Sequence, residues 1–187
     1  VTGSVTGVVT SPTLDYSSWT TSAVTHNIGT GASTGTGGTS GVTLVTGNNA
    51  NAAANTITNG GTYTLTDATP NAGTDGTVSW TDFGTLNANT AVNFQASGSV
   101  TGDLTSPTLN YSTYTQDLTL DITAGTITND GVGGTLSGFS TVNANGGQNN
   151  TVGGTAETYL LADGAPNAGS GNGYSWTAFQ NINDATG

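Results

Sequence analysis

The chain has 187 residues and a formal net charge of −11, and it contains no Lys, Arg, Cys or Met. Without cationic side chains it cannot neutralise nucleic-acid phosphates or bind anionic lipid electrostatically, so we expect no nucleic-acid partner and no charge-driven membrane binding. Without cysteine it has no disulfide framework, no thiolate nucleophile and no Cys-ligated zinc site.

The residue types favour an all-β fold. Hydrophobic residues make up 33% of the chain and charged residues only 6%, so charge repulsion does not keep the chain unfolded. Helix formers such as Glu, Gln, Lys and Arg are scarce or absent, whereas Thr, Val, Ile and aromatic residues, which suit strands, recur throughout. No apolar run approaches the roughly 18 residues of a membrane span, so we expect no direct membrane insertion. No basic segment marks a signal peptide, and we expect any export signal to lie outside this segment.

Short β-like runs follow one another along the chain, separated by segments rich in Gly and Asn. In the first half they lie at residues 4–19, 23–28, 42–46, 56–66 and 77–86. In the second half they lie at residues 118–122, 139–142, 158–161 and 174–182. Several runs alternate apolar and polar residues, which predicts strands with one buried and one wetted face.

The second half of the chain repeats the first. Gly-Ser-Val-Thr-Gly at residues 3–7 returns at 98–102, and Asp-x-x-Pro-Asn-Ala-Gly at residues 67–73 returns at 163–169. We therefore divide the chain into two repeat units, residues 1–95 and 96–187, which we expect to form one continuous structure.

The two ends of the chain are nearly in phase with this repeat. Gly187 corresponds to Ala91 and Val1 corresponds to Ala96, so another copy can begin almost directly after Gly187. We expect either a window of a longer tandem array or a subunit that stacks end to end. In both cases the expected partner is a further copy, joined head to tail.

Short runs with frequent Gly-rich turns predict a parallel β-solenoid, or β-helix. One coil buries too little surface by itself, but stacked coils share a continuous core, and hydrogen bonds between coils satisfy the backbone amides. The Gly-rich stretch at residues 29–41 is then expected at a corner. The alternative is two β-sandwich domains, one per copy, because about 95 residues with frequent turns also suit that fold. Large apolar residues are too few to fill two facing sheets easily, which favours the solenoid.

Several motifs resemble segments of giant secreted surface proteins of bacteria. Residues 14–17, 20–24 and 29–37 are similar to haemagglutinin-like adhesins and to proteins with RTX-type nonapeptide repeats, and residues 62–66, 71–74 and 78–83 resemble a segment of the same proteins. The resemblance covers most of both copies. It implies an extracellular or cell-surface location and a structural or adhesive role, with a glycan or a surface as a further target.

In those proteins such segments often run into turns where aspartate and backbone carbonyls bind Ca²⁺. Here the aspartate position is occupied by Asn55 in the first copy and by Asn150 in the second. A neutral amide removes the charge that holds a hard cation. We therefore expect turns without metal, with Asn side chains that hydrogen-bond along a ladder, and no cofactor. Ca²⁺ binding is the alternative.

Asp67 and Asp163 are the acids that clearly recur at matching positions. In their Pro-Asn-Ala-Gly context we expect each to cap a turn through local backbone hydrogen bonds, with Ca²⁺ ligation as the alternative. His26 is the only histidine, and in the second copy its place falls near Asp121. We expect it at a turn or on the surface. No residue is assigned a catalytic role, and we do not expect an enzyme.

Aromatic residues recur at matching positions, as Tyr63 with Tyr159 and Trp80 with Trp176. We expect these rings in the core, where stacking between equivalent rings fixes the register of the coils. The alternative is that an exposed Trp19 or Trp80 binds a glycan.

Taken together, the sequence predicts a structural or adhesive segment of an extracellular bacterial fibre, stalk or biofilm-matrix filament. The first alternative is a repeat module that binds Ca²⁺ or glycan. Thr-x-Thr runs raise ice binding as another, although the runs do not recur at one constant coil length. The last is a polysaccharide-cleaving β-helix enzyme, which would need two or three of the acids Asp67, Asp75, Asp82 and Asp163 to meet in one groove.

Overall fold

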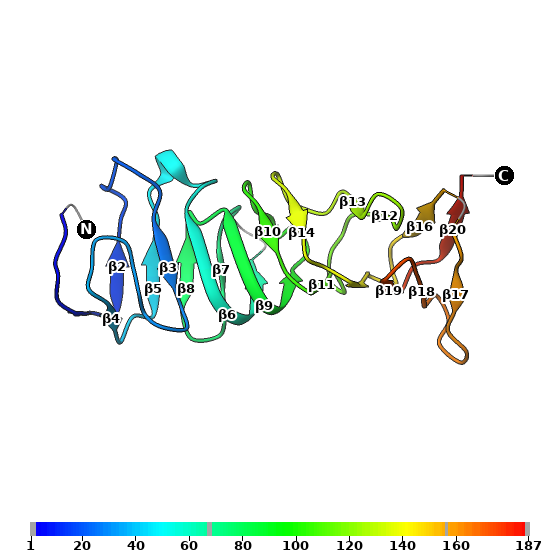
Figure 1. The fold of residues 1–187 in the computed structure, drawn as a ribbon, viewed down its shortest axis with the longest axis horizontal. Coiled ribbons are helices and arrows are strands. Elements are labelled where there is room, and N and C mark those ends of the chain that lie inside the picture. Colours follow the sequence, from blue (N-terminus) through cyan, green and yellow to red (C-terminus); the bar gives the residue numbers. More distant parts are fainter. Residues whose placement is uncertain (1–2, 67–68, 156, 186–187) are drawn as a thin grey trace.

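The structure is a computed structural model that describes residues 3–66, 69–155 and 157–185. It is a parallel β-solenoid of about six coils, drawn out along one axis from β2 at one end to β20 at the other (Figure 1). The described residues contain no α-helix and hence no helix able to cross a membrane; their one helical segment is the 3-10 turn η1 (Asn49–Asn51). The expected all-β solenoid is confirmed, and the two-sandwich alternative is wrong.

The strands are short because each coil turns after a few residues. Those of the first copy are β1 (Val9–Thr10), β2 (Thr13–Asp15), β3 (Thr25–Asn27), β4 (Thr39–Ser40), β5 (Leu44–Thr46), β6 (Thr56–Leu65), β7 (Gly73–Thr74), β8 (Ser79–Thr81) and β9 (Thr85–Phe94). Those of the second are β10 (Leu104–Thr105), β11 (Thr108–Asn110), β12 (Thr119–Asp121), β13 (Thr126–Thr128), β14 (Leu136–Ser137), β15 (Thr141–Asn143), β16 (Thr151–Gly154), β17 (Leu160–Leu161), β18 (Gly169–Gly171), β19 (Tyr174–Thr177) and β20 (Asn181–Asp184).

Two parallel ladders build the first copy. Along β2, β5 and β8 the residues in register include Leu14, Val45 and Trp80, and all three side chains are buried. Along β3, β6 and β9 the matching residues are His26, Ile57 and Leu86, which are also buried. Their strand neighbours are mostly Thr and Asn that face outward, since successive side chains of a strand point to opposite faces.

The second copy repeats both ladders. Leu109, Val142 and Trp176 lie in register on β11, β15 and β19, and Leu120, Val152 and Ile182 on β12, β16 and β20. Each copy also adds antiparallel strands beside the coils, β6–β7–β8 in the first and β17–β18–β19 in the second.

Strand β9 joins the two copies. It pairs with β6 on one side, and on the other it pairs with β10 through Leu86 and Asn87 and with β11 through Val92 and Asn93. The Phe94 ring stacks on Tyr111 of the second copy, with ring centroids 4.3 Å apart. The buried side chains of both copies form one cluster, so the core runs through the boundary without a break.

Candidate functional site

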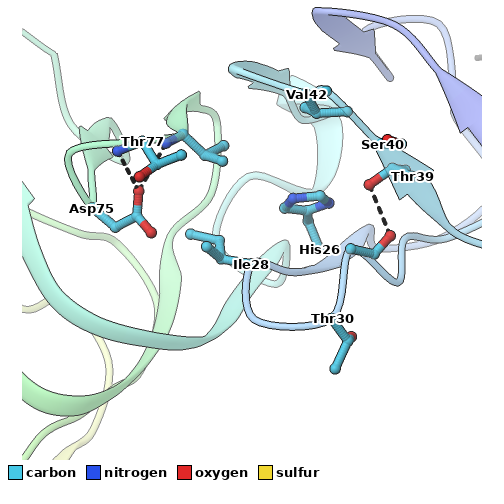
Figure 2. Close-up of a pocket in the computed structure, with 11 residues that line it drawn as sticks. His26, Ile28, Thr30, Thr39, Ser40, Val42, Asp75 and Thr77 are labelled. Carbon is cyan, nitrogen blue, oxygen red and sulfur yellow. Dashed lines mark hydrogen bonds between the residues drawn. The ribbon is translucent and has the colours of Figure 1, made fainter.

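A pocket of about 420 Å³ opens on the first copy, where β3, the turn after β4 and the β7–β8 hairpin meet (Figure 2). Its apolar wall is formed by Ile28, Val42 and Val78. Hydroxyl groups of Thr30, Thr39, Ser40 and Thr77 and the carboxylate of Asp75 supply its polar lining. Figure 2 shows the His26 ring between Ile28 and Val42, with Asp75 and Thr77 across from Thr39 and Ser40.

His26 lines this pocket from an inward position of β3, where its register partner is Ile57, and only 2% of the residue is exposed. Its Nδ1 is buried and has no hydrogen-bond partner among the described residues. Burial lowers the pKa of His26, against a smaller upward effect of the Asp75 carboxylate, so the ring is neutral at pH 7. The expectation of a turn or surface histidine is wrong, because the strand register puts His26 in the core.

Asp75 is held in place by the β7–β8 turn. One carboxylate oxygen, Oδ1, accepts the backbone N–H groups of Thr77 and Val78, both at 2.8 Å. No group of three or more His, Cys, Asp or Glu side chains that could hold a metal occurs within residues 3–66, 69–155 and 157–185. The residues that line the pocket supply hydrogen-bonding groups and apolar contacts.

Asn55 is fully buried and links three successive coils. Its Oδ1 accepts the backbone N–H of Val24 at 2.8 Å, and its Nδ2 donates to the backbone carbonyls of Asn48 and Asp82, at 2.8 and 2.7 Å. Its amide group is thus satisfied by main-chain partners alone.

Asn150 repeats this arrangement in the second copy. Its partners are the N–H of Leu118 and the carbonyls of Asn145 and Ala178. The expected ladder of stacked Asn side chains does not form at Asn55 and Asn150, because each amide bonds to backbone instead. Contacts of that kind occur elsewhere, where Asn110 donates to Asn93 at 3.0 Å.

The repeated aromatic residues pack within their own copies. The Tyr63 and Trp80 rings meet edge to face at 5.1 Å, and Tyr159 and Trp176 do so at 6.3 Å. Equivalent rings of the two copies therefore do not stack on each other as expected. Trp80 and Trp176 are buried, which rules out Trp80 as an exposed glycan platform, whereas Trp19 is partly exposed.

The two tyrosines of these pairs differ in their hydrogen bonds. The Tyr63 hydroxyl accepts the N–H of Gly60 at 2.8 Å and donates to the carbonyl of Asn87 at 3.2 Å, and burial raises its pKa to about 12. The hydroxyl of Tyr159 is buried without a partner among the described residues. Only the first copy thus completes the hydrogen bonding of its tyrosine.

The structure places one of the two recurring acids. Asp67 lies outside the described residues. Asp163 lies in the exposed turn between β17 and β18, and its carboxylate has no hydrogen bond to the described part of the chain, so the expected capping is not seen there. Asp75 and Asp82 flank β8 of the first copy, so no groove gathers them with Asp163.

The two end coils are the other notable surfaces. Six large hydrophobic side chains are exposed in the described residues, and all but Leu44 lie on the first or last coil. These five are Val5, Val8, Leu160, Leu161 and Ile182.

No family model, no curated protein and no solved structure matches the chain. The resemblance to giant secreted surface proteins therefore remains an expectation, and function has to be argued from the geometry.

Proposed function

We propose that the chain is a segment of an extracellular bacterial fibre, stalk or biofilm-matrix filament, in which units of this kind stack head to tail. The observation that carries the proposal is the match between the two ends of the chain and the two halves of the junction inside it. The unit is a spacer, because each added coil lengthens the axis by about one strand spacing, roughly 4.8 Å.

At the internal junction, the Gly-Ser-Val-Thr-Gly segment of the second copy docks on the Pro-Asn-Ala-Gly turn of the first. The N–H of Asn71 donates to the carbonyl of Ser99 at 2.9 Å, and Asn71 Oδ1 accepts the N–H of Thr101 at 2.7 Å. The packing is tight at Gly98, where a Cβ would lie 3.0 Å from Leu65 Cβ and from the Leu65 carbonyl oxygen. Two well-preserved motifs of the repeat are thus partners across the junction.

The first coil carries the same docking segment, which bonds to the next coil but leaves its two glycines uncovered. A Cβ at Gly3 or Gly7 would meet no atom within 4 Å, although both glycines recur at the tightly packed positions 98 and 102. Val5 is 53% exposed, whereas its counterpart Val100 is 2% exposed. Gly3, Val5 and Gly7 thus match residues that are buried or tightly packed at the internal junction, yet they are themselves exposed.

The last coil presents the complementary half. Leu161 is 68% exposed where Leu65 is fully buried, and Ile182 is 44% exposed where Leu86 is fully buried. Asn167, the counterpart of Asn71, is exposed. Open strand edges flanked by apolar side chains are ready-made sites for another strand.

A further unit that docks as the second copy docks on the first would have a defined register. Val9 and Thr10 would lie beside Ile182 and Asn183, as Leu104 and Thr105 lie beside Leu86 and Asn87. Gly3 would approach Leu161, and Ser4 and Thr6 would bond to Asn167. This contact uses neutral groups only, whereas the net charge of −11 opposes side-by-side clumping of fibres.

An extracellular role is further supported by the composition. A chain without Lys or Arg offers trypsin-like proteases no cleavage site, which is an advantage outside the cell.

Electron microscopy of joined units tests the proposal. Two and three chains are linked through Val-Asn-Phe-Gln, the sequence of residues 92–95, which restores the phase of the repeat. We expect straight rods whose length grows in equal steps. Separate particles on a flexible string would contradict the proposal. A Gly-Ser linker of the same length, which lacks the inward-facing Val and Phe, is the matched control.

A further inference from the structure

The pocket beside His26 has a filled counterpart in the second copy. By strand register, Val45 matches Val142 and Trp80 matches Trp176. Counting back from these pairs, Val42 corresponds to Phe139 and Val78 corresponds to Tyr174. Both pocket valines are therefore replaced by aromatic residues in the second copy.

Those two aromatic rings occupy the equivalent space. The rings of Phe139 and Tyr174 pack together with centroids 5.3 Å apart. The Tyr174 hydroxyl lies against Gly125, since a Cβ there would be 2.5 Å from it. Gly125 corresponds to Gly31, which lines the pocket, because each donates its N–H to the carbonyl four residues earlier in the turn after β3 or β12. In the second copy the Tyr174 ring therefore occupies the space that is open as the pocket in the first copy.

The remaining difference is His26, which takes the register position of Leu120. Leu120 is an ordinary core residue, whereas His26 leaves Nδ1 buried without a partner. The wall of the pocket therefore holds a polar ring where the second copy has an apolar side chain.

We propose that the pocket binds a phenolic ring of about the size of a tyrosine side chain, packed on Ile28, Val42 and Val78, with its hydroxyl near Gly31, as the Tyr174 hydroxyl lies against Gly125. An anionic ring is disfavoured by Asp75 and by the absence of cations. A sugar ring is disfavoured because the side chains that occupy the equivalent space in the second copy are aromatic. None of these residues takes part in the end contacts, so the site is independent of the stacking of units.

The test is a titration of the native chain with p-cresol, followed by NMR and calorimetry. We expect one saturable site per chain. N-acetyltyrosinamide tests whether the pocket accepts the ring of a tyrosine in a peptide. It binds as tightly as p-cresol only if the natural ligand is a tyrosine side chain of a protein segment and not a free phenol. Toluene, which lacks the hydroxyl, binds more weakly. Saturable binding of methyl glucoside at His26 in place of p-cresol would overturn the proposal.

Variants that carry the residues of the second copy locate the site. Val42→Phe with Val78→Tyr fills the pocket and abolishes p-cresol binding, while the melting temperature stays the same or rises.

The reverse substitutions are the matched control. Phe139→Val, Tyr174→Val and Leu120→His together open a second pocket and raise the stoichiometry to two p-cresol molecules per chain. If the native chain, with its fold intact, shows no saturable binding up to the solubility limit of p-cresol, the proposal is wrong. It is equally wrong if the filled variant binds as well as the native chain.

Discussion

The side chain of Asn55 donates to the backbone carbonyl of Asp82, one coil further along, at 2.7 Å. Asp82 has a positive φ of 61°, and its counterpart Ala178, which accepts from Asn150, has a φ of 62°. The buried amide and the left-handed turn therefore occur together in both copies. They form a repeated device that fixes one coil against the next.

Removing this amide should destabilise the solenoid strongly. Asn55→Ala leaves the N–H of Val24 without its partner and takes one hydrogen bond from each of the carbonyls of Asn48 and Asp82, of which Asn48 keeps the N–H of Asn51. We therefore expect a loss of about 3 kcal/mol in the free energy of unfolding. Urea denaturation measures it. Asn49→Ala, at an exposed position nearby, is the control and should change little. A loss equal to that of the control would show that the buried amide is not a structural link.

Replacing Asn55 by Asp tests the metal alternative directly. The carboxylate of Asn55→Asp would face the carbonyls of Asn48 and Asp82 that now receive hydrogen bonds, so we expect a larger loss of stability than for Asn55→Ala. Added Ca²⁺ should not restore it. Recovery of the melting temperature in Ca²⁺ but not in Mg²⁺ would reveal a calcium site latent in this turn.

Ala178 should be a site where glycine stabilises the chain. A left-handed backbone costs a residue with a Cβ about 1–2 kcal/mol, whereas glycine adopts it freely. After the greater flexibility of the unfolded glycine is counted, Ala178→Gly should raise the stability by about 0.5–1 kcal/mol. Ala185→Gly, at an exposed position without positive φ, should lower it slightly. Melting curves that move in the same direction for both variants would contradict the strain at 178.

His26 should make the stability fall in mild acid. Burial lowers the pKa of His26 below its ordinary value of 6.5, so the unfolded chain binds more protons than the folded chain as the pH falls through 6.5. Stability is therefore highest above that pH and is lost toward the lower pKa of the folded state. His26→Leu removes this contribution. Urea midpoints from pH 8 to pH 5 measure it, and parallel profiles of the two proteins would refute the burial of a neutral ring.

Asp130 should act with the opposite sign. Burial raises the pKa of its carboxyl group against the weaker effect of the Val132 N–H, which donates to Oδ1 at 2.9 Å. The folded chain thus binds more protons, and stability is lost as the pH rises from 3.8 through the raised pKa. Asp130→Asn keeps an acceptor without the charge and should be more stable than the native chain at pH 7 but not at pH 3. Asp163→Asn, in an exposed turn, is the control.

The solenoid fold can be predicted from the sequence because two of its patterns, the alternation within short runs and the duplication, both agree with stacked coils. Alternation within short runs predicts strands with one inward face, and the duplication predicts that these faces stack. The sequence shows that the motifs at residues 3–7 and 70–73 each recur. It does not show that residues 98–102, the second copy of the first motif, contact residues 70–73. Residues of the two motifs meet only through the winding of the chain, which no local pattern encodes.

The position of His26 shows where such reasoning fails. The repeat offset is 95 residues at the start of each copy, but at β3 and β12 the register gives 94, so His26 pairs with Leu120 and not with Asp121. A slip of one residue moves a strand side chain to the opposite face. The sequence offset therefore assigns a core position to the surface, and a pocket defined by side chains smaller than their counterparts cannot be anticipated from it.

The stacking of units is tested most directly by engineered disulfides, since the chain has no cysteine of its own. In two chains joined through Val-Asn-Phe-Gln, Asn183→Cys of the first chain and Thr10→Cys of the second should form a disulfide on oxidation. Asn87→Cys with Thr105→Cys, the same pair at the internal junction, is the positive control. Asn181→Cys with Thr10→Cys lies two residues out of register and is the negative control. We predict that the first pair cross-links as completely as the internal pair, whereas cross-linking no better than the out-of-register pair would contradict head-to-tail stacking.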